Sequence, residues 1–149
     1  MSKQTGFAFY DLDNLIERDH NRKISDIFRV DGEAYFRKLE RDSLLKLLSS
    51  QNSIIAVGGG CFVQPANFED IKQSGISVFL NAPLHALKKR LRYCKTRPIL
   101  KNTSVEEILR TRFPLYNKAD VTVDLAMQSK TKSVDLIIAG ILSYLDGNV

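Results

Sequence analysis

The stretch Ile54-Ile55-Ala56-Val57-Gly58-Gly59-Gly60 constrains the fold more than any other part of this chain. A short apolar run rich in β-branched residues predicts a buried strand. The three glycines that follow remove every side chain where that strand ends, which lets a ligand approach the backbone closely. In an open α/β sheet, ligands bind beyond the carboxyl ends of the strands. A flexible turn is the simpler interpretation of an isolated glycine run. Other residues of the chain are therefore needed to distinguish a flexible turn from a ligand-binding one.

Strands alternate with helices along the whole sequence. The apolar runs predict four strands, at 7–10, 53–57, 76–80 and 121–123. Helical spacing and capping signals predict helices at 24–29, 33–50, from Pro65 to Gly75, at 83–92, from Ser104 onward and at about 132–144. The last of these helices is expected to bury Val134, Ile137, Ile138, Ile141 and Leu145. This alternation indicates an α/β fold, a parallel sheet with crossover helices. A length of 149 residues fits a single domain over 1–149.

Composition narrows the class of protein. The apolar runs are too short to span a membrane, and two cysteines without metal spacing suit a reducing, cytoplasmic location. The net charge of +5 favours an anionic partner, and seven basic residues crowd 88–101. Nucleic acid ranks last as that partner, because this segment lacks interleaved aromatic residues beyond Tyr93.

Two groups of charged residues could carry chemistry. Asp11 and Asp13 follow the first strand, where one carboxylate can face a metal and the other a substrate. Taken alone, Asp13 is better explained as the N-cap of a helix. Arg37 and Glu40 lie three residues apart on a predicted helix and can pair. That pair is either an exposed ion pair or a device that orients Arg37 to grip a carboxylate.

These features occur in a recognisable order. Asp11-Leu12-Asp13, Phe36-Arg37, the three glycines, Arg97-Pro98 and Arg112-Phe113-Pro114-Leu115-Tyr116 together resemble shikimate kinase. The resemblance implies a P-loop-kinase-like, three-layer α/β fold. It also implies transfer of the ATP γ-phosphoryl group to the 3-hydroxyl of shikimate, with Mg²⁺ as cofactor, in the pathway to chorismate and aromatic amino acids.

The same resemblance assigns roles to individual residues. Asp11 would lie near Mg²⁺ and hold it through water, while Asp13 would bind the substrate hydroxyls and act on the one that is phosphorylated. Arg37 and Arg112 would bind the shikimate carboxylate. Backbone contacts to the substrate would come from Gly58, Gly59 and Gly60.

The basic segment supplies the remaining candidates. Arg97 would lie in a mobile lid at about 93–103 and stabilise the charge that develops during transfer. Arg90 would lie near the adenine ring, although a solvated charge explains it equally well. We expect a monomer.

One expected motif is missing from the 149 residues. No glycine is followed by lysine, so the phosphate loop G-x-x-x-x-G-K-[ST] does not occur. In the family that loop follows the central strand of five, in the order 2-3-1-4-5. We therefore expect a sheet of four strands, divided between 53–57 and 76–80, with residues 2–6 ending the family's first helix. A start codon placed too late, or a truncated gene, is the simplest explanation.

Two other functions stay open at this point. The chain could be a catalytically silent module that binds shikimate without ATP chemistry. A related small-molecule kinase, such as one acting on gluconate, shares the fold, although the paired Arg37 and Arg112 argue against it.

Overall fold

The computed structural model describes residues 1–92, 104–125 and 129–147, with backbone alone at 89–92 and 105. The chain divides into two compact units. The N-terminal unit is Ser2–Gly75, and the C-terminal unit comprises the described residues from Ile76 onward. A single domain over 1–149 stays a prediction, and the predicted lid at 93–103 lies outside the described residues.

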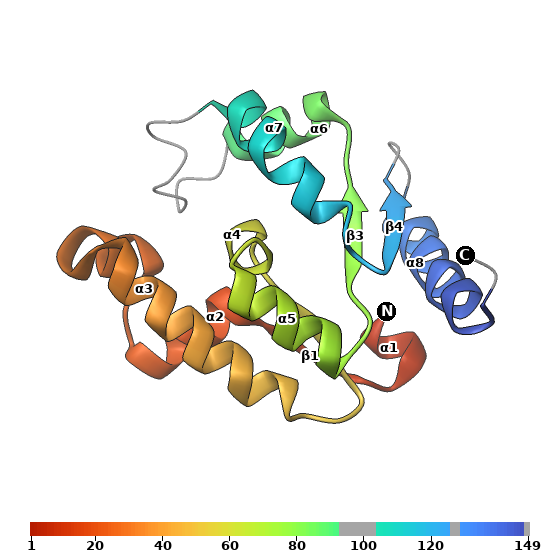
Figure 1. Ribbon diagram of the computed structural model, residues 1–149, viewed down its shortest axis with the longest axis horizontal. Coiled ribbons are helices and arrows are strands. Elements are labelled where there is room, and N and C mark those ends of the chain that lie inside the picture. Colours follow the sequence, from red (N-terminus) through yellow and green to blue (C-terminus); the bar gives the residue numbers. More distant parts are fainter. Residues whose placement is uncertain (93–103, 126–128, 148–149) are drawn as a thin grey trace. The chain divides into compact units, whose positions relative to one another are not determined.

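The N-terminal unit is built around two parallel strands and the helices that follow them (Figure 1). Its elements are α1 (Ser2–Thr5), β1 (Ala8–Asp11), α2 (Leu12–His20), α3 (Ile24–Leu48), β2 (Ser53–Ala56), α4 (Gly59–Phe62) and α5 (Pro65–Ser74). Strands β1 and β2 run in register from Ala8 opposite Ser53 to Asp11 opposite Ala56. Helix α3 packs against α2 and α5, and the core between these elements contains Leu12, Ile16, Ile27, Phe36, Leu39, Leu44, Leu47 and Cys61.

Glycine and proline set the helix boundaries that the sequence predicts. Gly32 has φ 82° and ψ 174°, so α3 is kinked at this residue and consists of two helical segments. Only glycine adopts such a backbone conformation readily, and the predicted break between 24–29 and 33–50 is confirmed. Helix α5 begins at Pro65 and ends at Gly75, also as predicted.

The residues after β1 differ from the prediction. Asp11, not Asp13, is the N-cap of helix α2, because its carboxylate accepts a hydrogen bond from the Asn14 backbone N–H at 3.0 Å. Asp13 is the second residue of that helix. Beyond the cap at Asp13, no residue range for helix α2 was predicted from the sequence, and the short helix α4 was not predicted at all.

The C-terminal unit also contains two parallel strands. Its elements are β3 (Val78–Asn81), α6 (Leu84–Arg92), α7 (Val105–Tyr116), β4 (Val121–Asp124) and α8 (Lys130–Leu145). Helix α8 packs on β4, as Figure 1 shows, so closely that a Cβ atom at Gly140 would lie 2.9 Å from Val121 Cγ1. The prediction that α8 buries five apolar residues is only partly right: Val134, Ile137, Ile138 and Ile141 are half-buried, while Leu145, the last residue of the helix, is 64% exposed.

The four strands found in the described part of the chain are parallel within their pairs, and helices alternate with them as predicted. They pair as β1 with β2 and β3 with β4. This pairing agrees with the expectation of a sheet divided between 53–57 and 76–80. Among the residues that the structure describes, no helix is long and apolar enough to cross a bilayer.

Candidate functional site

The glycine turn, Gly58-Gly59-Gly60, brings the backbone of the N-terminal unit against two of the predicted site residues. Helix α4 begins in this turn, with Gly58 as its N-cap. A Cβ atom at Gly60 would lie only 2.8 Å from both terminal nitrogens of Arg37, and one at Gly58 would lie 3.9 Å from Asp13 Oδ1. The turn is therefore glycine because Arg37 occupies the space that a side chain at position 60 would need.

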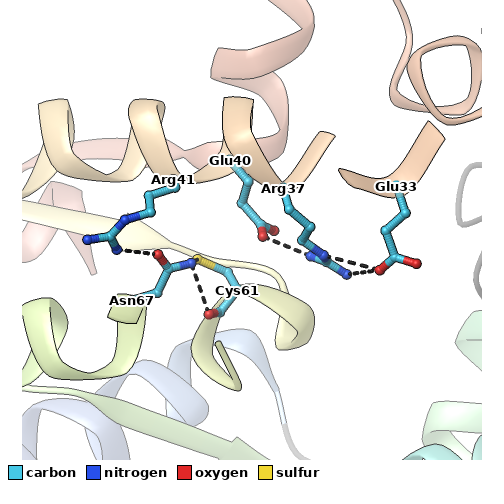
Figure 2. A network of polar contacts seen from close by, with 6 residues as sticks. All are labelled: Glu33, Arg37, Glu40, Arg41, Cys61 and Asn67. Carbon is cyan, nitrogen blue, oxygen red and sulfur yellow. Dashed lines mark hydrogen bonds and ion pairs between the residues drawn. The ribbon is translucent and has the colours of Figure 1, made fainter. Parts of the chain in front are cut away.

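The guanidinium of Arg37 is held by two carboxylates (Figure 2). Its Nη1 donates to Glu40 Oε2 at 2.8 Å, while Nε and Nη2 donate to Glu33 Oε1 at 3.2 and 3.0 Å. The side chain of Glu40 is only 2% exposed and that of Arg37 17% exposed. The predicted pairing of Arg37 with Glu40 is confirmed, and burial excludes the alternative of an ordinary surface ion pair. Glu33 was missed, although it lies four residues before Arg37 and helical spacing could have found it.

Burial and charge act against each other in this pair. Burial lowers the pKa of Arg37, but the hydrogen bond and charge of Glu40, reinforced by Glu33, raise it above its usual value overall. The pKa of Glu40 is also raised, because burial outweighs the stabilising bond from Arg37 and because Asp13 adds negative charge nearby. Glu40 and Glu33 therefore stabilise the charged form of Arg37.

A second group of polar side chains continues from this site. The Asn67 Nδ2 group donates to the Cys61 carbonyl oxygen at 3.2 Å and contacts Cys61 Sγ at 3.4 Å. Asn67 Oδ1 accepts from Arg41 Nη1 at 2.8 Å, and Arg41 Nη2 donates to Asp70 Oδ2 at 2.7 Å. Burial raises the pKa of the Cys61 thiol to about 12, which supports its prediction as a small buried residue rather than a reactive one.

The comparisons with known proteins agree with one another. The family model described as shikimate kinase matches residues 1–142. The chain belongs to the shikimate kinase family. It is 32% identical over 143 residues to a shikimate kinase of Persephonella marina, covering 95% of this chain and 87% of that protein. A shikimate kinase of Chlorobium chlorochromatii is 34% identical over 157 residues, with 97% and 83% covered.

Solved shikimate kinases share the fold. The enzyme from Acinetobacter baumannii, solved in complex with shikimate, matches with a TM-score of 0.87 at 32% identity, over 99% of this chain and 83% of that one. The enzyme from Aquifex aeolicus matches with a TM-score of 0.79 at 32% identity, over 99% and 86%. The α/β, P-loop-kinase-like fold predicted from the sequence is therefore confirmed. Shikimate kinases are phosphotransferases with ATP as phosphoryl donor.

The residues present fit the substrate side of a shikimate kinase better than the nucleotide side. The 149 residues contain no Gly-Lys-Ser/Thr phosphate loop, so the backbone cradle and lysine that bind nucleotide phosphates are not among them. Asp11 already accepts the capping bond from Asn14. Within the described ranges, no group of three or more His, Cys, Asp or Glu side chains could hold a metal ion. A single carboxylate such as Asp11 could still contact Mg²⁺ through water.

The remaining predicted residues lie elsewhere in the chain. Arg112 is on α7 in the C-terminal unit, and Arg90 is on α6 in the same unit. Arg97 lies outside the described residues. Within the N-terminal unit, the structure brings together Asp13, Arg37 and the glycine turn.

Proposed function

We propose that Asp13, Arg37 and the glycine turn form the acceptor site at which this shikimate kinase binds shikimate and presents its 3-hydroxyl to ATP. The observation that carries this proposal is the arrangement of Arg37. Its guanidinium is fixed by two carboxylates, and its terminal nitrogens point to Gly60, where a side chain would not fit.

The hydrogen-bond inventory of Arg37 supports a carboxylate ligand. A guanidinium has five N–H groups. Among the described residues, Glu40 takes one on Nη1, and Glu33 takes Nε–H and one on Nη2. These contacts leave one N–H on each terminal nitrogen as the donors that a carboxylate ligand would take. Arg112 is proposed as the second arginine on the same carboxylate.

Asp13 is suited to the hydroxyl end of the substrate. It lies in the first turn of α2, where the helix dipole stabilises a negative charge, and Gly58 leaves room beside it. We assign it the orientation of the reacting hydroxyl and acceptance of its proton. Arg97 is proposed to stabilise transferred charge, Arg90 to lie near the nucleotide base, and Asp11 to hold Mg²⁺ through water. The monomeric state and the cytoplasmic location stay predictions.

Substitution of Arg37 tests the acceptor site directly. Arg37→Ala should abolish shikimate binding that calorimetry detects in the wild-type chain. Arg29→Ala is the matched control, because Arg29 lies on the same helix in an ion pair with Asp26 and is 72% exposed. Arg37→Ala leaves Glu40 buried without its cation, which costs about 3–5 kcal/mol, so Arg37→Ala combined with Glu40→Ala serves if the single variant does not fold. Unchanged affinity in either folded variant would remove the carboxylate assignment.

A catalytically silent shikimate-binding module is the second candidate function. The sequence observation that favours it is the missing phosphate loop in these 149 residues. Shikimate-dependent ADP release by the purified chain distinguishes the two functions. Turnover supports the kinase, whereas shikimate binding without ATP binding or turnover supports the silent module.

A further inference from the structure

Asn67 is a buried side chain with hydrogen bonds at both ends of its amide. It lies in the first turn of α5 and is 1% exposed. The orientation of the amide is fixed by chemistry, because Arg41 can only donate and must face the oxygen. The nitrogen therefore faces the Cys61 carbonyl, as Figure 2 shows, and a flipped amide would place two donors against each other.

Arg41 is itself fixed from the other side. Asp70, three residues after Asn67 on α5, accepts from Arg41 Nη2, so helix α5 offers two acceptors to one guanidinium. Arg41 also lies four residues after Arg37, which places both arginines on one face of α3. The same helix face thus carries the proposed ligand-binding arginine and the anchor for Asn67.

The far end of this chain of bonds is the glycine turn. Cys61 directly follows Gly60, where an added Cβ atom would lie 2.8 Å from both terminal nitrogens of Arg37. Helix α4 has only four residues, two of them glycine, and a helix of this length is not stable without tertiary contacts. The Asn67 amide supplies such a contact from a neighbouring helix to the residue beside Gly60.

We propose that Asn67 is a positioning residue for the acceptor site, which holds the glycine turn at a fixed distance from Arg37. The bonds run from α3 through Arg41 to Asn67 and on to Cys61, so the turn is tied to the helix that carries Arg37. This role rests on the proposed function, because the position of the turn affects shikimate binding only if shikimate binds at this site.

Two substitutions separate this role from simple packing of α3 on α5. Asn67→Asp keeps an oxygen for Arg41 but loses both donated contacts to Cys61 and places a carboxylate against its carbonyl. Asn67→Ala removes the bonds at both ends. Positioning predicts that each variant binds shikimate at least about tenfold more weakly than wild type. A role confined to the Arg41 bond predicts wild-type affinity for Asn67→Asp, and that result would overturn the proposal.

The control is Ser77→Ala, which removes the hydroxyl of another buried polar residue, in the C-terminal unit, where Ser77 Oγ donates to Asp120 Oδ2 at 2.5 Å. Calorimetric shikimate affinity is measured on the full chain for all variants, at a temperature where each is folded. Ser77→Ala should bind like wild type. If it loses affinity as strongly as Asn67→Asp, the effect is general loosening and the proposal is wrong.

A second readout keeps the test independent of shikimate. The Nε–H resonance of Arg37 in the ¹⁵N-labelled free protein, assigned through its loss in Arg37→Lys, reports the surroundings of the guanidinium. It should shift in Asn67→Asp and stay in place in Ser77→Ala. If wild type binds no shikimate, the proposed function fails and this resonance alone decides. An unchanged resonance in Asn67→Asp then refutes positioning by Asn67.

Discussion

Substitution of Gly60 by alanine tests whether Arg37 is rigidly held. The added Cβ atom would lie 2.8 Å from Nη1 and Nη2 of Arg37 and 3.2 Å from Cζ. Ordinary contacts between such atoms are about 3.5 Å or more, so the guanidinium must retreat by about 0.7 Å. An arginine free at its far end would move at little cost. Arg37 is not free, because Glu40 and Glu33 hold it at 2.8 and 3.0 Å.

The magnitude follows from the bond that the retreat breaks. A retreat of that size along the bond to Glu40 lengthens it from 2.8 Å to about 3.5 Å, outside the roughly 2.7–3.2 Å of a well-formed N–H···O bond. Loss of a hydrogen bond to a charged group costs about 1.5–3 kcal/mol, and here the acceptor is a buried carboxylate. We therefore expect the free energy of unfolding to fall by about 1.5–3 kcal/mol. Shikimate affinity should fall about 10- to 100-fold, which corresponds to about 1.4–2.7 kcal/mol.

Urea unfolding and calorimetric titration with shikimate measure the two effects. Gly75→Ala is the matched control, because a Cβ atom at Gly75 meets nothing within 4 Å and its φ of 177° suits any residue. A Gly60→Ala protein with wild-type stability and wild-type affinity would refute the reasoning. Wild-type stability with lost affinity would show that the guanidinium swings away freely, so that the two carboxylates do not fix it.

Two further predictions concern other parts of the N-terminal unit. Glu17 bonds Lys23 Nζ at 2.6 Å and the Ile24 N–H at 3.0 Å, and the Lys23 bond lowers its pKa. Its stabilisation is therefore present above the ordinary Glu pKa of about 4.3 and lost as the pH falls through the lower folded value. Glu17→Gln should lower the free energy of unfolding by about 0.5–1.5 kcal/mol at neutral pH. The difference from wild type should become smaller in acid. Urea unfolding at several pH values measures it, with Asp19→Asn, in an exposed ion pair, as the control. Cys61 is buried and its pKa is raised to about 12. In a Cys94→Ser variant it should therefore not react with a maleimide at neutral pH until guanidinium chloride unfolds the chain. Rapid labelling of the folded protein would contradict this.

Local signals in the sequence were enough for most of the fold. Pro65 fixes its own φ and suits the first turn of a helix, whereas Gly32 and Gly75 lack the side chain that favours helix continuation, so the boundaries at these three residues were predicted correctly. Two helices were missed for different reasons. Helix α2 has a clear start signal, but the cap was placed at Asp13 when Asp11 provides it. Helix α4 contains two glycines, and its sequence shows no helical pattern. Contacts from α5 hold it in place, and these contacts are not visible in the sequence.

The same division applies to the candidate site. The pairing of Arg37 with Glu40 could be predicted from helical spacing. The glycine turn could be predicted as a candidate binding element because residues without side chains let a ligand approach the backbone. The bond between Arg41 and Asn67 joins residues 26 positions apart, and no pattern in the sequence connects them. Only the packing of α3 on α5 brings the two side chains together, so this part of the site had to be read from the structure.

Arg37 and Arg41 lie on one face of α3, and we infer different roles for them from the groups that accept their hydrogen bonds. Arg37 and Arg41 are four residues apart and each bonds a carboxylate. Arg41 also gives a bond to an amide that in turn holds the backbone beside Gly60, so its guanidinium is part of the scaffold. Arg37 lies beside Gly60, and in the proposed acceptor site its remaining N–H on each terminal nitrogen binds the ligand. The glycine turn is therefore linked to both arginines, because it has no side chain where the guanidinium of Arg37 lies, and because Arg41, through Asn67, bonds the residue next to Gly60.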